Sequence, residues 1–177
     1  AARGIDVVLK EIAREPLLKG LAVIQGLITP LVKRKKLTKV EGRAILDRIT
    51  PADTDVPLHH CDLVVEAAVE RMDIKEKIFE GLAARSRPDT ILATNTSALS
   101  VSELAAATPG PERVVGIHFF NPVAKMQLVE VVKAEQTSPE TLARAVAYVQ
   151  QVGKMPVVVK DSPGFASSRL GLVIGLE

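Results

Sequence analysis

The sequence lacks the features that mark secreted, nucleic-acid-binding and membrane-spanning proteins. Its 177 residues include one cysteine, Cys61, so no disulfide forms within the chain and a reducing compartment is favoured. Lys and Arg total 23 against 21 Asp and Glu, and this near balance gives no case for nucleic acid as a partner. No apolar run reaches membrane-spanning length, and Asp6, Lys10 and Glu11 fall where a signal peptide would be apolar. We therefore expect a cytoplasmic protein with neither a nucleic-acid nor a membrane partner.

What the chain does contain is an alternation of short aliphatic runs with longer amphipathic segments. A composition of 47% hydrophobic and 25% charged residues is typical of a globular domain with a core. The alternation predicts strands joined by crossover helices in a mostly parallel sheet, which is an α/β fold. The predicted strands span residues 6–12, 62–67, 90–94, 113–119, 127–133 and 157–160. The predicted helices span 15–36, 73–85 and 138–153, and two more begin after Thr38 and Ser100.

Local signals refine this pattern at three places. Pro30 lacks an N–H and its ring crowds the preceding turn, so we expect it to kink or interrupt the helix over 15–36. Thr38 and Glu41 have the spacing of a capping box at a helix start. Only a few residues join the strands at 113–119 and 127–133, so these two are expected to be antiparallel or at a sheet edge.

The most informative motif is GIHFFNPVAKMQLVE at 116–130, which puts a histidine at the end of one strand and a glutamate on the next. Imidazole is suited to exchanging protons at neutral pH, so His118 is a candidate base for an alcohol oxidation. Glu130 is the candidate for accepting a hydrogen bond from the second ring nitrogen and fixing the tautomer. The alternative is a core histidine bound to a backbone carbonyl, with Glu130 solvated.

Polar residues that follow the other strands are weaker signals when taken alone. Ser97 in the sequence NTS at 95–97 and Asn121 beyond His118 are equally typical of helix caps and turns. Glu70 and Lys75 have a spacing that also fits a surface pair worth little.

Two clusters of charged or ligating residues are candidate binding sites. Residues 33–36 are all basic, which is typical either of a solvated face or of a site that attracts an anionic ligand. His59 and His60 precede Cys61, but with no further ligand at usable spacing a zinc site is not expected. No metal is predicted.

Five segments, taken in order, give the sequence a resemblance to one family. They are VVLKE at 7–11, DLVVEAAVE at 62–70, ILATNTSALS at 91–100, GIHFFNPVAKMQLVEVV at 116–132 and GKMPVVVKDSPGF at 153–165. The set resembles the NAD-binding domain of the L-3-hydroxyacyl-CoA dehydrogenases, in the version found in multifunctional fatty-acid-oxidation proteins. Any one string is weak, whereas five in this order across nearly the whole chain are specific.

The resemblance implies a Rossmann-like fold, NAD as cofactor, and oxidation of L-3-hydroxyacyl-CoA to 3-ketoacyl-CoA in fatty-acid β-oxidation. It implies that His118 is the base and that Glu130 orients it. Ser97 would hydrogen-bond the substrate oxygen, and Asn121 would lie beside substrate and nicotinamide. The basic run at 33–36 would border the coenzyme A moiety. The residues implied on the cofactor side are Glu11, Glu70, Lys75 and Asn95.

The carboxylate of Glu11 also bears on the choice of cofactor. In the resembling family this position ends the second strand and is usually an aspartate. A carboxylate there holds the adenosine ribose hydroxyls and repels the extra phosphate of NADP. NAD is therefore expected in preference to NADP.

Three departures from the family pattern qualify this reading. The first strand and its GxGxxG turn would precede VVLKE, so we expect an incomplete NAD-binding domain at 1–162, with two strands lacking a neighbour. Residues 163–177 would begin the helical C-terminal domain, and Ser168 stands where the family has asparagine. An isolated chain of this kind is expected to be inactive, and the full-length form to be a homo-oligomer that binds a 3-hydroxyacyl-CoA substrate.

Two other functions remain open on the sequence. One is a noncatalytic module for acyl-CoA binding or assembly, in which Ser168 marks a decayed site. The other is a related hydroxy-acid dehydrogenase whose substrate carries no coenzyme A.

Overall fold

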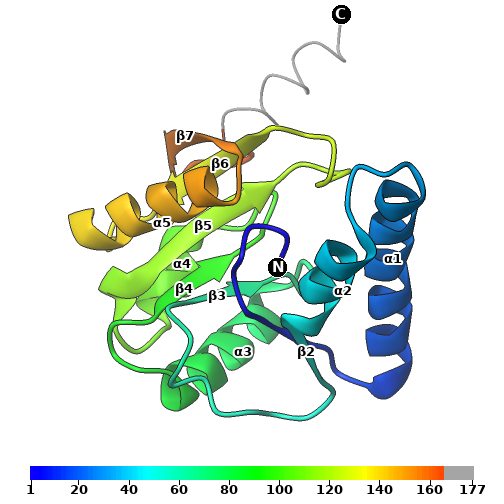
Figure 1. Cartoon of the computed structure of the whole chain (residues 1–177). Helices are drawn as coiled ribbons and strands as arrows, with labels where there is room; N and C mark the ends of the chain where they lie inside the picture. The colour runs from blue at the N-terminus through cyan, green and yellow to red at the C-terminus, as the bar shows by residue number, and fades with distance from the viewer. Residues whose placement is uncertain (166–177) are drawn as a thin grey trace, which may run out of the picture. The chain divides into compact units, whose positions relative to one another are not determined.

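The computed structural model describes residues 1–165, which fall into two compact units (Figure 1). The first unit is Ala1–Val56 and the second begins at Pro57. The described strands form one two-stranded sheet, β1-β2, and one five-stranded sheet in the order β3-β4-β5-β6-β7. All neighbouring strands are parallel except β5 and β6. The prediction of an α/β fold with a mostly parallel sheet is confirmed.

The first unit consists of β1 (Val7–Lys10), α1 (Arg14–Lys33), α2 (Lys39–Asp47) and β2 (Ile49–Ala52). The predicted capping box opens α2, because the Glu41 amide donates to the Thr38 hydroxyl and the Thr38 amide donates to the Glu41 carboxylate. β2 was not predicted from the sequence. Its four residues, ITPA, contain a proline, which cannot donate a backbone hydrogen bond to a neighbouring strand. A sequence with proline at such a position is therefore not typical of a strand within a sheet.

The structure differs in two respects from what the sequence predicts for the helix over 15–36. α1 runs through Pro30 and ends at Lys33, so the proline does not interrupt the helix. By length and composition alone α1 is also apolar enough to cross a membrane. One such helix near the N-terminus is weak evidence, since helices of soluble proteins pass the same test.

The second unit carries the larger sheet and three helices among its described residues. In chain order its elements are β3 (Leu63–Glu66), α3 (Met72–Arg85), β4 (Ile91–Thr94), α4 (Val101–Ala106), a 3-10 turn (Pro111–Arg113), β5 (Val114–Phe119), β6 (Leu128–Lys133), α5 (Pro139–Gln151) and β7 (Met155–Lys160). The antiparallel pairing expected between 113–119 and 127–133 is confirmed by β5 and β6. β3 is an edge strand, with β4 as its one hydrogen-bonded neighbour in the described chain.

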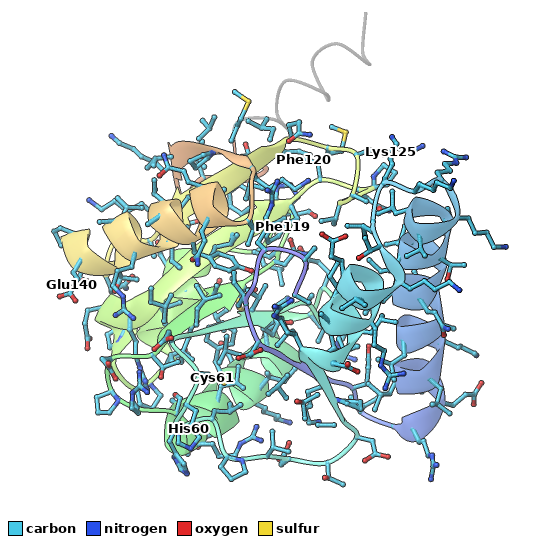
Figure 2. All side chains as sticks on the ribbon, in the orientation of Figure 1. His60, Cys61, Phe119, Phe120, Lys125 and Glu140 are labelled. Carbon is cyan, nitrogen blue, oxygen red and sulfur yellow. The ribbon has the colours of Figure 1, made fainter. Side chains whose placement is uncertain are left out.

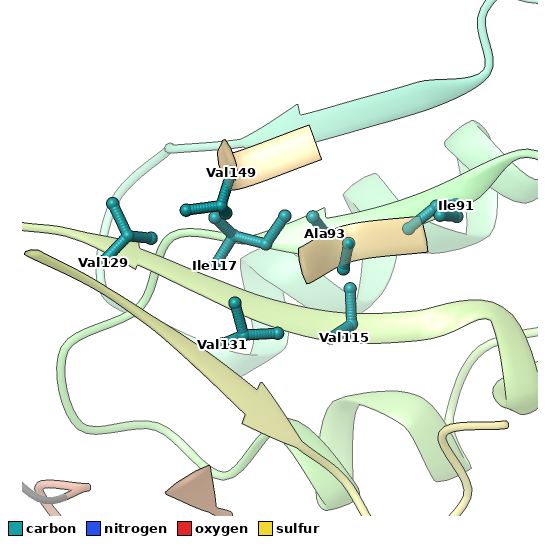
Figure 3. Close-up of a cluster of buried hydrophobic side chains, with 8 residues drawn as sticks. Ile91, Ala93, Val115, Ile117, Val129, Val131 and Val149 are labelled. Carbon is teal, nitrogen blue, oxygen red and sulfur yellow. The ribbon is translucent and has the colours of Figure 1, made fainter. Parts of the chain in front are cut away.

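One face of the five-stranded sheet forms the main hydrophobic core with α5 (Figure 3). Successive strand residues point to opposite faces, so residues two apart on each strand share this core. The cluster consists of Ile91, Ala93, Val115, Ile117, Val129, Val131, Ala145 and Val149. The residues between these on the strands therefore point to the other face.

That other face packs closely on α4, and Gly116 permits the approach. A Cβ at this position would lie 2.7 Å from Cβ of Val132 on the neighbouring strand and 3.1 Å from Cγ2 of Val101 on α4. Contacts this short require the strand or the helix to move. Gly116 therefore fixes the distance between α4 and the sheet.

We expect Gly116→Ala to destabilise the protein by about 1–3 kcal/mol, because an added methyl group overpacks a rigid contact. Urea unfolding measures this, and Gly81→Ala in α3 is the matched control, since its Cβ would meet only a flexible Arg85 side-chain atom at 3.8 Å. Equal stability of Gly116→Ala and the parent protein would contradict the proposed close approach.

The segment after β7 is tied to the start of α4 by Asp161. Its carboxylate accepts hydrogen bonds from the Ser100 hydroxyl (2.8 Å) and the Ser102 amide (2.7 Å). Burial alone would raise the pKa of Asp161, but the hydrogen bonds from Ser102, Ser100 and the Val101 amide favour the charged form and lower it. The folded state thus holds this carboxylate ionised.

Asp161→Asn is expected to lower the free energy of unfolding by about 1 kcal/mol at neutral pH, a modest value because the carboxylate is partly solvated. Because the folded-state pKa is depressed, this contribution is present above the ordinary pKa of 3.8 and is lost as pH falls through the lower folded value. Urea unfolding across this pH range should show the difference from the parent shrinking in acid. The exposed Glu80 provides the control Glu80→Gln. A difference that does not change with pH would contradict the assignment.

Candidate active site

The structure brings His118 and Glu130 together through the strand register. Both belong to the antiparallel β5–β6 pair and stand directly opposite each other. Residues opposite each other in such a pair have neighbouring side chains on the same face of the sheet. His118 Nδ1 lies 2.8 Å from Glu130 Oε2, and the two residues are 6% and 1% exposed. The histidine–carboxylate pair is therefore built into the sheet.

The surroundings of the imidazole leave its other nitrogen available. An ionised carboxylate can only accept, so Glu130 favours the tautomer with the proton on Nδ1. Within residues 1–165 no hydrogen bond reaches Nε2. The rings of Phe120 and Phe165 lie 4.7 Å and 5.9 Å from the imidazole, centre to centre, and help to fix its plane. This arrangement presents Nε2 as a proton acceptor in partly apolar surroundings.

The other candidate residues of this unit follow the carboxyl ends of β3, β4 and β5. In a sheet of this kind, ligands bind beyond these ends. Glu70 comes after β3, Asn95 and Ser97 come after β4, and Asn121 comes after β5. The three strands are parallel neighbours, so the candidate residues share one edge of the sheet.

Asn95 connects the ends of these three strands. Its backbone amide donates to the carbonyl of Glu66 on β3, and its side-chain oxygen accepts from the amide of Phe119 on β5, at 2.9 Å. Phe119 adjoins His118. Asn95 therefore holds the exit of β4 against the strand that carries the imidazole.

Asn121 lies on the exposed connection between β5 and β6. Figure 2 labels Phe119 at the end of β5, and Phe120 and Lys125 on this connection. The Asn121–Pro122 peptide bond is cis. The Lys154 ammonium donates to the carbonyls of Val123 and Met126, both at 2.6 Å, and so ties the connection to the start of β7.

Glu70 organises the turn that carries Ser97. Its Oε1 accepts from the Thr96 hydroxyl, from the Ser97 amide at 2.8 Å and from the Ala98 amide at 3.2 Å. Burial alone would raise the pKa of Glu70, but these hydrogen bonds and the Lys75 charge lower it. The Ser97 side chain is exposed, so the turn offers its hydroxyl to a ligand.

Lys75 is fully buried and lies in an ion pair, so the interpretation of Glu70 and Lys75 as a solvated surface pair does not hold for this lysine. Its ammonium lies 2.8 Å from each carboxylate oxygen of Glu66 and 3.8 Å from Oε2 of Glu70. Glu66 was not singled out from the sequence. The available signal was a carboxylate at the last position of an otherwise aliphatic strand, LVVE.

Glu11 belongs to the first unit, where it follows β1. Its amide donates to the carbonyl of Ala52 on β2, and its side chain accepts one long hydrogen bond, 3.4 Å, from the amide of Ile12. The carboxylate keeps acceptor capacity at the carboxyl end of a parallel strand, which fits the recognition of ribose hydroxyls. The residues present thus fit NAD.

The remaining candidates lie elsewhere. The basic residues 33–36 are exposed, and Lys33 and Arg34 line an open hollow of about 570 Å³ on α1. His59 and His60 are exposed, and Cys61 follows them; in residues 1–165 no three His, Cys, Asp or Glu side chains gather to hold a metal ion. Ser168 and most of the segment 163–177 lie outside the described residues.

Comparison with known proteins gives concordant matches. The family described as 3-hydroxyacyl-CoA dehydrogenase, NAD binding domain, matches residues 1–162. The fatty acid oxidation complex subunit alpha of Acinetobacter baylyi is 42% identical over 170 residues, which are 96% of this chain and 24% of that protein. This chain thus spans about a quarter of the length of that relative.

Two solved structures are similar in both sequence and fold. A 3-hydroxybutyryl-CoA dehydrogenase from Escherichia coli is 38% identical, with a TM-score of 0.88 over 92% of this chain and 34% of that chain. An (S)-3-hydroxybutyryl-CoA dehydrogenase from Ralstonia eutropha is 36% identical, with a TM-score of 0.92 over 99% of this chain and 66% of that chain.

Proposed function

We propose that the protein containing this chain oxidises an L-3-hydroxyacyl-CoA to the 3-ketoacyl-CoA, since the chain belongs to the 3-hydroxyacyl-CoA dehydrogenase family and matches the NAD-binding domain of that family. The observation that carries the proposal is the contact of 2.8 Å between His118 Nδ1 and Glu130 Oε2 on facing strands. An alcohol oxidation needs a base at the hydroxyl, and a buried, oriented imidazole supplies one.

In this mechanism His118 Nε2 takes the hydroxyl proton of the substrate. Bound NAD supplies the hydride acceptor for the same carbon. Glu130 holds the proton on Nδ1 before the reaction and stabilises the imidazolium formed by proton transfer. Because the carboxylate is already in place, no reorganisation is needed when the positive charge develops.

The other site residues act by positioning. The Ser97 hydroxyl donates to the substrate oxygen, and Asn121 lies beside the substrate. On the cofactor side we assign Glu11 to the adenosine ribose. Glu70 and Asn95 form the edge against which the nicotinamide portion binds, and the buried Lys75 supports Glu70 from beneath. The support for these roles is their location after the carboxyl ends of β1, β3, β4 and β5, and for Lys75 its ion pair with Glu66 at that edge.

The names of similar proteins support a proposal for the substrate and the setting of the enzyme. We assign a coenzyme A thioester because relatives named for 3-hydroxybutyryl-CoA and for fatty acid oxidation are 36–42% identical to this chain over the matched residues. The exposed basic residues 33–36 suit the phosphates of that moiety. We further propose a cytoplasmic homo-oligomer, and we expect turnover from the complete natural polypeptide and not from these 177 residues alone.

The proposal is tested with His118→Gln and Glu130→Gln in that complete polypeptide, assayed in the reverse direction with acetoacetyl-CoA and NADH. His118→Gln should lower kcat by about 100-fold to 10,000-fold, the range of a lost general base. Glu130→Gln should also lower kcat, because an amide can donate as well as accept and so no longer fixes the tautomer, and it lacks the charge that stabilises the imidazolium. The control is His60→Gln, an exposed histidine of the same unit. Unchanged kcat in folded His118→Gln would refute the mechanism.

A further inference from the structure

An ion pair with no exposed face lies below the edge of the sheet that carries the proposed site. Lys75 is 0% exposed and Glu66 is 5% exposed. The Lys75 ammonium meets both carboxylate oxygens at 2.8 Å, so the contact is bidentate. Glu66 also accepts from the Thr94 hydroxyl at 2.7 Å and from the amide of Ala68. Its carboxylate therefore accepts from donors on α3, on β4 and in the segment that follows β3.

Such a pair is a costly way to fill a protein interior. Removing two charges from water costs several kcal/mol per ion, and an apolar pair of similar volume is often as stable or more so. Stability alone therefore gives no reason for Glu66 and Lys75. What an apolar pair cannot do is hold a third charged group in place.

The third group is Glu70. Its Oε2 lies 3.8 Å from the same Lys75 ammonium, and its Oε1 takes the Thr96 hydroxyl and the amides of Ser97 and Ala98. A chain of contacts thus runs from Glu66 through Lys75 and Glu70 to the Ser97 turn. The amide of Asn95, which opens this turn, also donates to the Glu66 carbonyl.

We propose that Glu66 is a positioning residue for the dehydrogenase reaction, because it holds Lys75 against Glu70 and through them fixes the turn that presents Ser97. This role depends on one part of the proposed function, namely that Ser97 binds the substrate oxygen. Glu66 itself is buried and touches neither substrate nor cofactor; it acts through two other side chains.

The role predicts an effect on geometry that is separate from stability. In Glu66→Gln the amide cannot form the same bidentate charged contact, so the ammonium loses its fixed place and Glu70 loses the charge that anchors it. The amides of Ser97 and Ala98 then exchange with solvent more readily, because their acceptor is no longer held. Displacement of a positioning group by about 1 Å is enough to lower kcat by about 100-fold.

Two variants test this in the complete natural polypeptide: Glu66→Gln, and the milder Thr94→Val, which removes one hydrogen bond to the Glu66 carboxylate at nearly constant volume. Hydrogen exchange followed by mass spectrometry measures, without substrate, how well the backbone amides of residues 95–99 in the turn are protected from solvent. Steady-state kinetics with acetoacetyl-CoA and NADH reads kcat at saturation. The control is Asp73→Asn, which breaks an exposed ion pair with Arg71 at the start of the same helix.

The expected result for both variants is exchange in 95–99 that is faster by about tenfold, with core peptides unchanged, together with a fall in kcat of about 10-fold to 100-fold. Asp73→Asn should match the parent in both measurements. Unchanged exchange at 95–99, or unchanged kcat in a folded variant, overturns the proposal. If Glu66→Gln does not fold, Thr94→Val decides by the same criteria. Failure of the proposed function is seen separately, as full activity of His118→Gln.

Discussion

The pairing of His118 with Glu130 across β5 and β6 is the constraint on which the site depends. The two residues stand directly opposite each other in an antiparallel strand pair, so the pairing itself brings the imidazole and the carboxylate to within 2.8 Å of each other. A slip of one residue would turn one of the two side chains to the α5 face and separate them. The apolar cluster that α5 buries therefore also fixes the register of the catalytic pair. Packing and chemistry are set by the same alternation of residues along the two strands.

Two buried charged pairs of this unit meet on one face of its sheet. Glu66 pairs in register with Thr94, Thr94 with Gly116, and His118 with Glu130, so these positions share the face opposite the α5 core. Each buried carboxylate on this face contacts a basic side chain: Glu66 contacts Lys75, and Glu130 contacts His118. Each lies close to the end of a strand, next to a turn that carries an exposed polar side chain. The apolar face supplies stability, while the polar face positions the groups that reach the ligand.

The sequence predicted the parts that depend on local pattern, and it missed those that depend on tertiary contacts. The strand over 113–119 was predictable from its aliphatic run, and the capping box at Thr38 from its spacing. Full burial of Lys75 was not predictable, because lysine is rarely buried and its partner Glu66 lies nine residues away on another element. Continuation of α1 through Pro30 was missed because the proline lies so near the end that few helical hydrogen bonds are affected.

The most direct test of the account is the protonation state of the His118 ring, observed by nitrogen-15 NMR at a pH where the imidazole is neutral. If Glu130 accepts from Nδ1 as the geometry indicates, the neutral ring carries its proton on Nδ1 and leaves Nε2 as the unprotonated nitrogen. Glu130→Gln should remove this preference. A neutral ring with its proton on Nε2 in the unaltered protein would contradict the account, because the nitrogen assigned to accept the substrate proton would already be occupied.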